Sequence, residues 1–148
     1  MLTIHAADEV RRGWDAEPLK DAGVAVEGDR VAGVGPLDEL RERFPGARVR
    51  HWPGVLGPAL VHEGPLPEAP SPRERVHAVL KSGATAVLEE YAGAPGLRAA
   101  ASRNDVAVLP RTKKTAITDT ERADLAVFDA EGACIATVCA GRLVHRRR

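Results

Sequence analysis

The sequence predicts an α/β protein in which strand-rich segments near both ends of the chain enclose a short stretch of alternating helices and strands. Apolar residues on both sides of Gly28-Asp29, a dipeptide suited to a two-residue turn, predict a β-hairpin over residues 24–34. From Ser71 onward, helical spacing alternates with short apolar runs, which are typical of parallel strands buried on both faces. Residues 123–145 return to short strands separated by glycine-containing turns.

The composition bounds the size and the partners of the protein. A length of 148 residues predicts one domain, or one domain and a fragment. The chain has 21 basic and 21 acidic residues and 3% aromatic residues, which excludes a generally basic nucleic-acid binder and a base-stacking platform. No apolar run approaches the roughly 20 residues that cross a bilayer, and no signal peptide is evident. We therefore expect a cytoplasmic protein that binds neither nucleic acid nor membrane.

The two cysteines, Cys134 and Cys139, lie in one apolar stretch. Two cysteines make neither a disulfide framework nor a four-ligand zinc site. We expect two small buried thiols in a reducing compartment.

In the first half of the chain, hydrophobic spacing and turn residues define each expected element. Pro36 suits the start of a helix and Pro45-Gly46 its end. Apart from the hairpin, we expect a strand at 1–6, a loop over 7–21, a helix at 37–44, and strands at 47–52 and 55–61.

In the second half, prolines first exclude regular structure over residues 63–72. The following segment has the alternation of helical and strand patterns described above, and residues 111–122 are polar. We expect helices at 73–81 and 96–103 and strands at 84–88, 106–109, 123–129, 134–139 and 143–145.

Four fragments of the chain, in this order, resemble the amidohydrolase superfamily and especially its imidazolonepropionase-like proteins. Residues 21–36 (DAGVAVEGDRVAGVGP) resemble the family's first hairpin, and residues 81–87 (KSGATAV) resemble its second barrel strand. Residues 122–129 (RADLAVFD) and 136–144 (ATVCAGRLV) are similar to the strands that close the family's small domain.

The resemblance implies a composite β-sandwich built from both chain ends, with a β/α (TIM) barrel inserted between its halves. The corresponding domains here are 1–54 together with 123–148, and an insertion at 55–122. A complete eight-stranded barrel needs about 200–250 residues. The insertion therefore holds only a vestigial, partial barrel.

The resemblance also implies where catalytic metal ligands would stand. Family members bind metal through a His-x-His pair at the end of the first barrel strand, and the metal activates water. Aligning Pro58-Ala59-Leu60-Val61 with the family pattern puts Gly64 and Leu66 at those two positions. We therefore expect no metal, no cofactor and no catalytic residue, and a pseudoenzyme that acts as a binding or scaffold protein.

The alternative is a minimal metal-dependent hydrolase that acts on non-peptide carbon–nitrogen bonds, with zinc or iron. Its candidate residues are His62, Glu63 and Glu89, which follow two strands whose ends share an edge if the strands are parallel. On an extended chain Glu89 and Glu90 would point in opposite directions, so that one of them at most faces a common pocket.

Two further expectations concern binding. Arg111 and Lys113 follow the third strand and are candidates for holding an anionic small-molecule ligand. Three barrel strands cannot close into a barrel, so a sheet edge is left open. We expect a homodimer or a protein partner to cover it.

Overall fold

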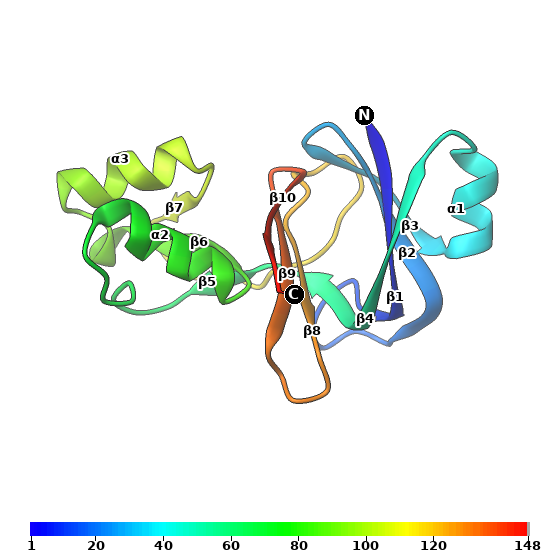
Figure 1. The fold of residues 1–148 in the computed structure, drawn as a ribbon, viewed down its shortest axis with the longest axis horizontal. Coiled ribbons are helices and arrows are strands. Elements are labelled where there is room, and N and C mark those ends of the chain that lie inside the picture. Colours follow the sequence, from blue (N-terminus) through cyan, green and yellow to red (C-terminus); the bar gives the residue numbers. More distant parts are fainter. Residues whose placement is uncertain (148) are drawn as a thin grey trace.

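The computed structural model of the protein describes residues 1–147, and it has two β-sheets that lie side by side (Figure 1). Arg148, the last residue of the predicted second segment of the β-sandwich, lies outside the described residues. The larger sheet and α1 (Leu37–Arg43) occupy one end of the molecule. The smaller sheet, with α2 (Pro72–Lys81) and α3 (Pro95–Arg103), occupies the other.

The larger sheet has seven strands in the order β10-β9-β8-β4-β1-β2-β3. Its central strand β4 pairs with β1 in parallel and with β8 in antiparallel orientation. Strands from both ends of the chain therefore share one sheet. Their bounds are β1 Leu2–Val10, β2 Leu19–Glu27, β3 Arg30–Pro36, β4 Arg48–Pro58, β8 Leu125–Phe128, β9 Cys134–Cys139 and β10 Arg142–Arg146.

The predicted hairpin is confirmed as β2 and β3, which pair in antiparallel orientation around a turn at Gly28 and Asp29. Gly28 has a φ of 60°, which glycine adopts without steric cost. The helices and the strands of the second half also form, within a few residues of their expected bounds.

Two expectations for the first half are wrong. The loop over 7–21 is shorter, because β1 runs to Val10 and pairs there with the start of β2. The expected break between a strand at 47–52 and a strand at 55–61 is also wrong. A single strand, β4, continues through Gly54 to Pro58, and the next strand begins at Leu60. Gly54 has a φ of 93°, and a Cβ at this position would overlap the carbonyl oxygen of Phe128. The close approach of the end of β8 to β4 therefore requires glycine here.

Side chains from both parts of the larger sheet form one core. They come from β1, β2, β3 and β4 in the first half of the chain and from β8 and β9 in the second, and they are almost completely buried. The principal members are Val10, Val24, Val26, Trp52, Leu56, Leu125, Val127 and Val138.

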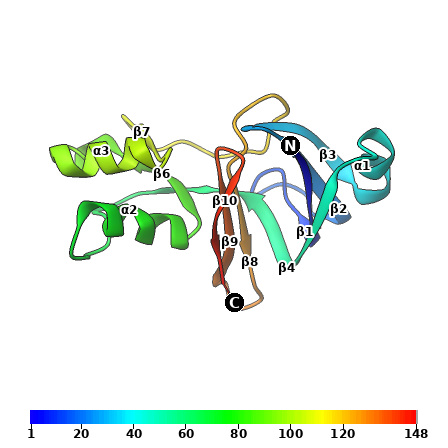
Figure 2. The ribbon, with the colours of Figure 1, turned by 45° about the horizontal axis from the view of Figure 1, so that its top comes forward.

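The smaller sheet consists of three parallel strands in the order β5-β6-β7, with bounds Leu60–His62, Ala84–Leu88 and Ala107–Leu109. Helices α2 and α3 pack together on one face of it (Figure 2). Ser71 caps α2, since its Oγ accepts the backbone N–H of Glu74 at 3.2 Å. No helix within residues 1–147 is long and apolar enough to span a membrane.

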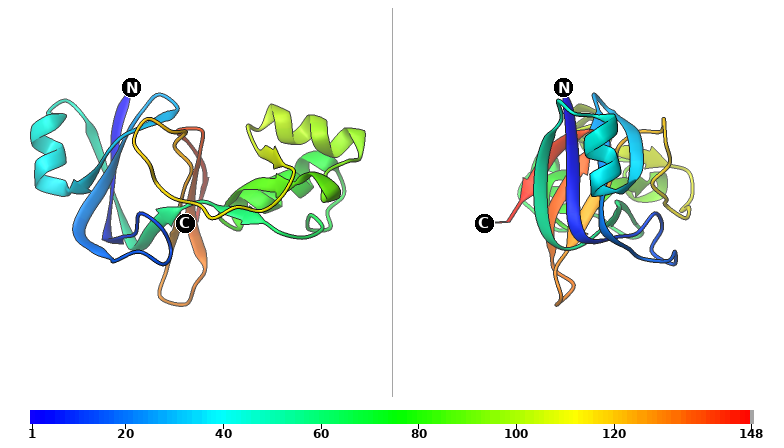
Figure 3. Two further views of the ribbon diagram at one scale, coloured as in Figure 1. Left: turned by 180° about the vertical axis from the view of Figure 1, so that it is seen from behind. Right: turned by 90° about the vertical axis from the view of Figure 1, so that its right-hand side faces the viewer.

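A buried hydrogen bond joins the larger sheet to helix α2, which covers the smaller sheet. The Thr137 hydroxyl of β9 donates to the Leu80 carbonyl at the end of α2, at 2.7 Å, and Thr137 is fully buried. The segment 110–124 makes a second connection, since it runs from β7 across to β8 (Figure 3).

Candidate functional site

A cleft of about 470 Å³ lies between the smaller sheet and the segment 110–124. Its floor is the face of the sheet opposite the helices. Val61, Ala86 and Ala107 are direct partners in the parallel register, so their side chains project from the same face, and all three line the cleft. Leu109 extends this apolar floor.

The segment that roofs the cleft is fixed to the larger sheet. The backbone N–H of Ile117 donates to the Arg12 carbonyl at 2.7 Å, and the Ile117 side chain is buried in the core of the larger sheet. The N–H of Val31 donates to the Glu121 carbonyl at 2.9 Å. The roof is therefore held to the larger sheet by backbone hydrogen bonds and by the buried Ile117 side chain, and its end is joined to the start of the smaller sheet by the Ala59 N–H, which donates to the Asp124 carbonyl at 3.0 Å.

Charged side chains lie along the rim formed by this segment. Arg122 donates to Asp124 at 2.8 Å, and both are half-buried. Burial lowers the pKa of the Arg122 guanidinium, but the hydrogen bond and charge of Asp124 outweigh burial, so the net pKa is raised. Lys114 pairs with Asp15 across the surface. Lys113 lines the cleft and makes no ion pair with any residue in 1–147.

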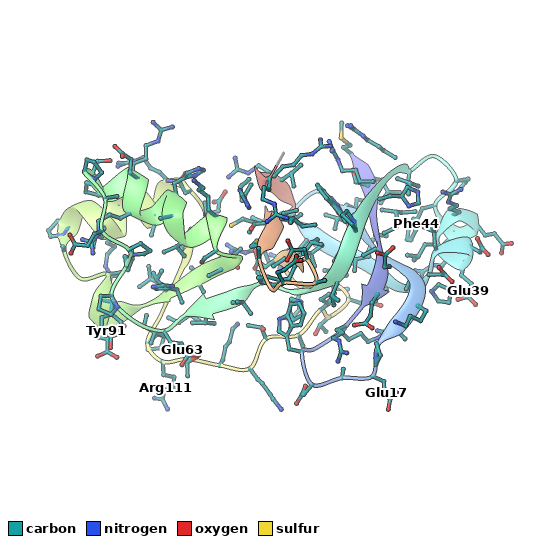
Figure 4. All side chains as sticks on the ribbon, turned by 60° about the horizontal axis from the view of Figure 1, so that its bottom comes forward. Glu17, Glu39, Phe44, Glu63, Tyr91 and Arg111 are labelled. Carbon is teal, nitrogen blue, oxygen red and sulfur yellow. The ribbon has the colours of Figure 1, made fainter. Side chains whose placement is uncertain are left out.

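Of the two residues predicted to bind an anion, the structure places Lys113 in the cleft lining, but not Arg111. Arg111 is exposed and projects to the same side of the molecule as Glu63 and Tyr91 (Figure 4).

The predicted hydrolase residues lie at one edge of the smaller sheet, because its strands are parallel and their carboxyl ends meet there. His62 is the direct partner of Val87, which is buried under the helices, so the imidazole projects from the helix-covered face. Its Nε2 lies 3.0 Å from the Pro65 carbonyl oxygen. Val61 lines the cleft in its place.

The geometry expected for Glu89 and Glu90 is wrong. The chain is not extended there, because β6 ends at Leu88 and residues Glu89–Tyr91 form a 3-10 turn closed by the Ala92 N–H. Both carboxylates are exposed, and Glu89 lies 3.7 Å from the guanidinium of Arg98. Solvent surrounds these two side chains rather than a pocket.

Within residues 1–147, no group of three or more His, Cys, Asp or Glu side chains is arranged to hold a metal ion. His62, Glu63 and Glu89 of a single chain therefore do not form such a group. Cys134 and Cys139 are free thiols. Burial raises the pKa of both, and that of Cys139 reaches about 11, so the Cys139 thiol is protonated at neutral pH.

Sequence reasoning located the edge of the smaller sheet but missed the cleft. The short runs around Val61, Ala86 and Ala107 indicated buried strands without showing which face is open. The signal available was the length of the polar segment 111–122, which is longer than a direct connection between neighbouring strands needs.

Comparison with known protein families finds a match over one short segment of the chain. The sequence model of the bacterial imidazolonepropionase-like composite domain matches residues 22–47, which span most of β2, β3 and α1. A search of curated proteins finds no match to the chain.

Several solved structures have a similar fold. An adenosine deaminase from Xanthomonas campestris with bound zinc has a TM-score of 0.55 and 21% identity, over 77% of this chain and 36% of that chain. The guanine deaminase of E. coli has a TM-score of 0.57 and 14% identity, over 73% and 35%. A triazine hydrolase from Arthobacter aurescens has a TM-score of 0.51 and 16% identity, over 72% and 34%. This chain thus spans about a third of these enzymes, and the likeness concerns the fold.

Proposed function

We propose that the chain is a non-catalytic relative of the amidohydrolases that binds a small molecule in the cleft between the smaller sheet and segment 110–124. In this proposal the seven-stranded sheet corresponds to the family's composite β-sandwich, and β5, β6 and β7 are what remains of its barrel. The matched residues 22–47 and the fold shared with two deaminases and a triazine hydrolase support the relationship.

The composition of the cleft floor carries the proposal. A metal-dependent hydrolase needs imidazole or carboxylate ligands that face the reacting centre, where they hold the ion that activates water. The floor presents Val61, Ala86 and Ala107 instead, and the two carboxylates that line the cleft, Glu121 and Asp124, lie on the opposite segment, where Asp124 is paired with Arg122. Methyl groups can contact the apolar part of a ligand, but they can neither coordinate a metal ion nor act as a general acid or base.

The shape and rim of the cleft indicate the chemical class of the ligand. A volume of about 470 Å³ is within the range that holds metabolite-sized molecules. Lys113 supplies a cation without an ion-pair partner in the described chain, on the rim above the apolar side chains of the floor. A compact apolar or aromatic body with one carboxylate or phosphate group matches both features.

The metal-dependent hydrolase remains the second candidate. The observation that favours it is the position of His62, Glu63 and Glu89 at the carboxyl edge of parallel strands, where barrel enzymes carry their chemistry. A second copy of the chain could complete such a site. Elemental mass spectrometry on protein purified without tag or chelator separates the two functions. About one zinc, iron or manganese per chain, lost in His62→Ala, together with carbon–nitrogen hydrolysis, would overturn the binding function.

A fragment screen tests the binding function directly. Ligand-observed NMR with small aromatic carboxylates is expected to yield binders that Ala107→Leu abolishes, because the larger side chain fills the floor. Ala99→Leu, at an exposed position on α3, is the control and should leave binding intact. Lys113→Gln should weaken the anionic binders about tenfold, the loss of one exposed charge-assisted contact. Binders that are unaffected by Ala107→Leu would show that the cleft is not their site.

A further inference from the structure

A second groove, of about 370 Å³, opens at the other side of the larger sheet, where the start of β1 lies near the β2–β3 and β9–β10 turns (Figure 1). It shares no lining residue with the first cleft among residues 1–147. Its polar and charged lining residues are Thr3, His5, Arg48, Arg50 and Arg142.

The register of the sheet aims two of these arginines into the groove. β1 and β4 are parallel, with Thr3 opposite Arg48 and His5 opposite Arg50. Residues in register project from the same face, and alternation puts Val49 on the opposite face against α1. Arg142 lies across the groove at the start of β10. Arg48 and Arg50 of β4 and Arg142 of β10 thus line one opening.

Two of these positive charges, those of Arg48 and Arg50, lack counter-charges within residues 1–147. No Asp or Glu is among the groove's lining residues in the described chain. Arg48 and Arg50 make no ion pair within residues 1–147, whereas Arg142 donates to Asp105 at 2.8 Å. Burial, followed by the charges of Arg48 and Arg146, lowers the pKa of Arg50. Because the whole chain has equal numbers of acidic and basic residues, this excess of charge is local.

His5 adds a neutral hydrogen-bond donor to the same wall. The Trp52 indole can only donate, and it donates to Nδ1 of His5 at 3.1 Å, so the ring proton of the neutral imidazole is on Nε2. His5 is largely buried but lines the groove. In the described chain, every fully buried side-chain nitrogen has a hydrogen-bond partner. Within residues 1–147 Nε2 has no protein acceptor, so it is not one of the fully buried nitrogens, and we infer that its N–H is open to the groove and can meet a ligand there.

We propose that this groove is a binding site for a small anion, the phosphate or carboxylate group of a metabolite, with Arg48 and Arg50 as its principal ligands and Arg142 opposite them. A guanidinium group binds a phosphate or a carboxylate through paired N–H donors. An anion between two arginines also reduces the electrostatic repulsion between their positive charges. The site is distinct from the cleft of the proposed function. It stands if that function fails.

Isothermal titration of the full chain with sodium pyrophosphate and, separately, sodium citrate in 50 mM salt tests the site. The two probes distinguish phosphate from carboxylate as the preferred group. Binding of at least one is expected, weakened at least tenfold in Arg50→Gln and in Arg48→Gln. Arg41→Gln, at an exposed arginine on α1, is the matched control and should bind as the unaltered chain does.

Two outcomes would overturn the proposal. One is the absence of binding for both probes at millimolar concentration, and the other is binding that Arg48→Gln and Arg50→Gln leave unchanged. Circular dichroism shows whether each variant folds. Arg50→Lys, which keeps the charge but not the planar fork, should retain part of the affinity even if Arg50→Gln proves unstable.

Discussion

The Trp52 indole N–H donates to Nδ1 of His5 at 3.1 Å, and the two rings lie nearly parallel, with 17° between their planes. The bond links two neighbouring strands of the larger sheet at a point where His5 is only 3% exposed. Burial, followed by the charge of Arg50, lowers the pKa of His5 from 6.5 to about 4. The folded protein therefore keeps this imidazole neutral where an unfolded chain would protonate it.

This pKa predicts that the protein loses stability in mild acid. Below pH 6.5 the unfolded chain takes up a proton at His5 while the folded chain does not until near pH 4, so the free energy of unfolding falls as pH falls. Between pH 6.5 and 5 the expected loss is about 1.5 kcal/mol. Urea unfolding at several pH values measures it.

His5→Asn isolates the contribution of this histidine, because an amide can still pair with the Trp52 N–H but does not titrate. The slope between pH 6.5 and 5 should disappear in His5→Asn and persist in His77→Asn, where the histidine is exposed. An unchanged slope in His5→Asn would assign the effect to other groups.

The hydrogen bond from Thr137 to the Leu80 carbonyl predicts how firmly the larger sheet is joined to α2. Thr137→Val keeps the shape of the side chain but removes the donor. The Leu80 carbonyl still accepts from the Gly83 N–H, so the expected cost is about 1 kcal/mol of unfolding free energy. Thr137→Ser retains the hydroxyl, so it should lose only the stability that its missing methyl group contributes. Equal chemical-denaturation midpoints for Thr137→Val and the unaltered chain would show that this bond adds nothing.

The close approach of two turns predicts unequal effects of alanine at two glycines. Gly141 has a φ of 80°, and a Cβ there would overlap the carbonyl oxygen of Gly28. Gly132 has a φ of 83° but open space around it. Gly132→Ala should cost about 1 kcal/mol for the left-handed backbone alone. Gly141→Ala should cost at least twice as much, because backbone must move. Thermal unfolding of both variants compares them, and equal shifts would contradict the contact.

The edges of the smaller sheet predict self-association. β5 and β7 are three-residue edge strands, each paired on one side only within the described chain. Unpaired strand edges beside an apolar face favour a covering partner. We expect a dimer at micromolar concentration by size-exclusion chromatography with light scattering. A monomer throughout that concentration range would contradict self-association, and the sheet edges would then be covered by a different protein or stay uncovered.

Local chemistry was enough to predict several elements. The Gly28-Asp29 turn and the apolar residues around it specify a hairpin without help from distant parts of the chain. The helix over 73–81 is equally local, since Ser71 caps it and Val76, Val79 and Leu80 form its buried face. The extension of β1 to Val10 was missed because a partner at Leu19, not residue spacing, stabilises it.

The sequence by itself determined the local elements, the resemblance of their order to a known family, and the shortness of the segment between the two parts of the larger sheet. Only the tertiary structure decided that Val61, not His62, faces the cleft, and that Arg48 and Arg50 share a groove with Arg142. Neighbouring residues of a strand project to opposite faces, and the face that stays open depends on which distant segments cover the other. Those partners are brought together only by the complete fold.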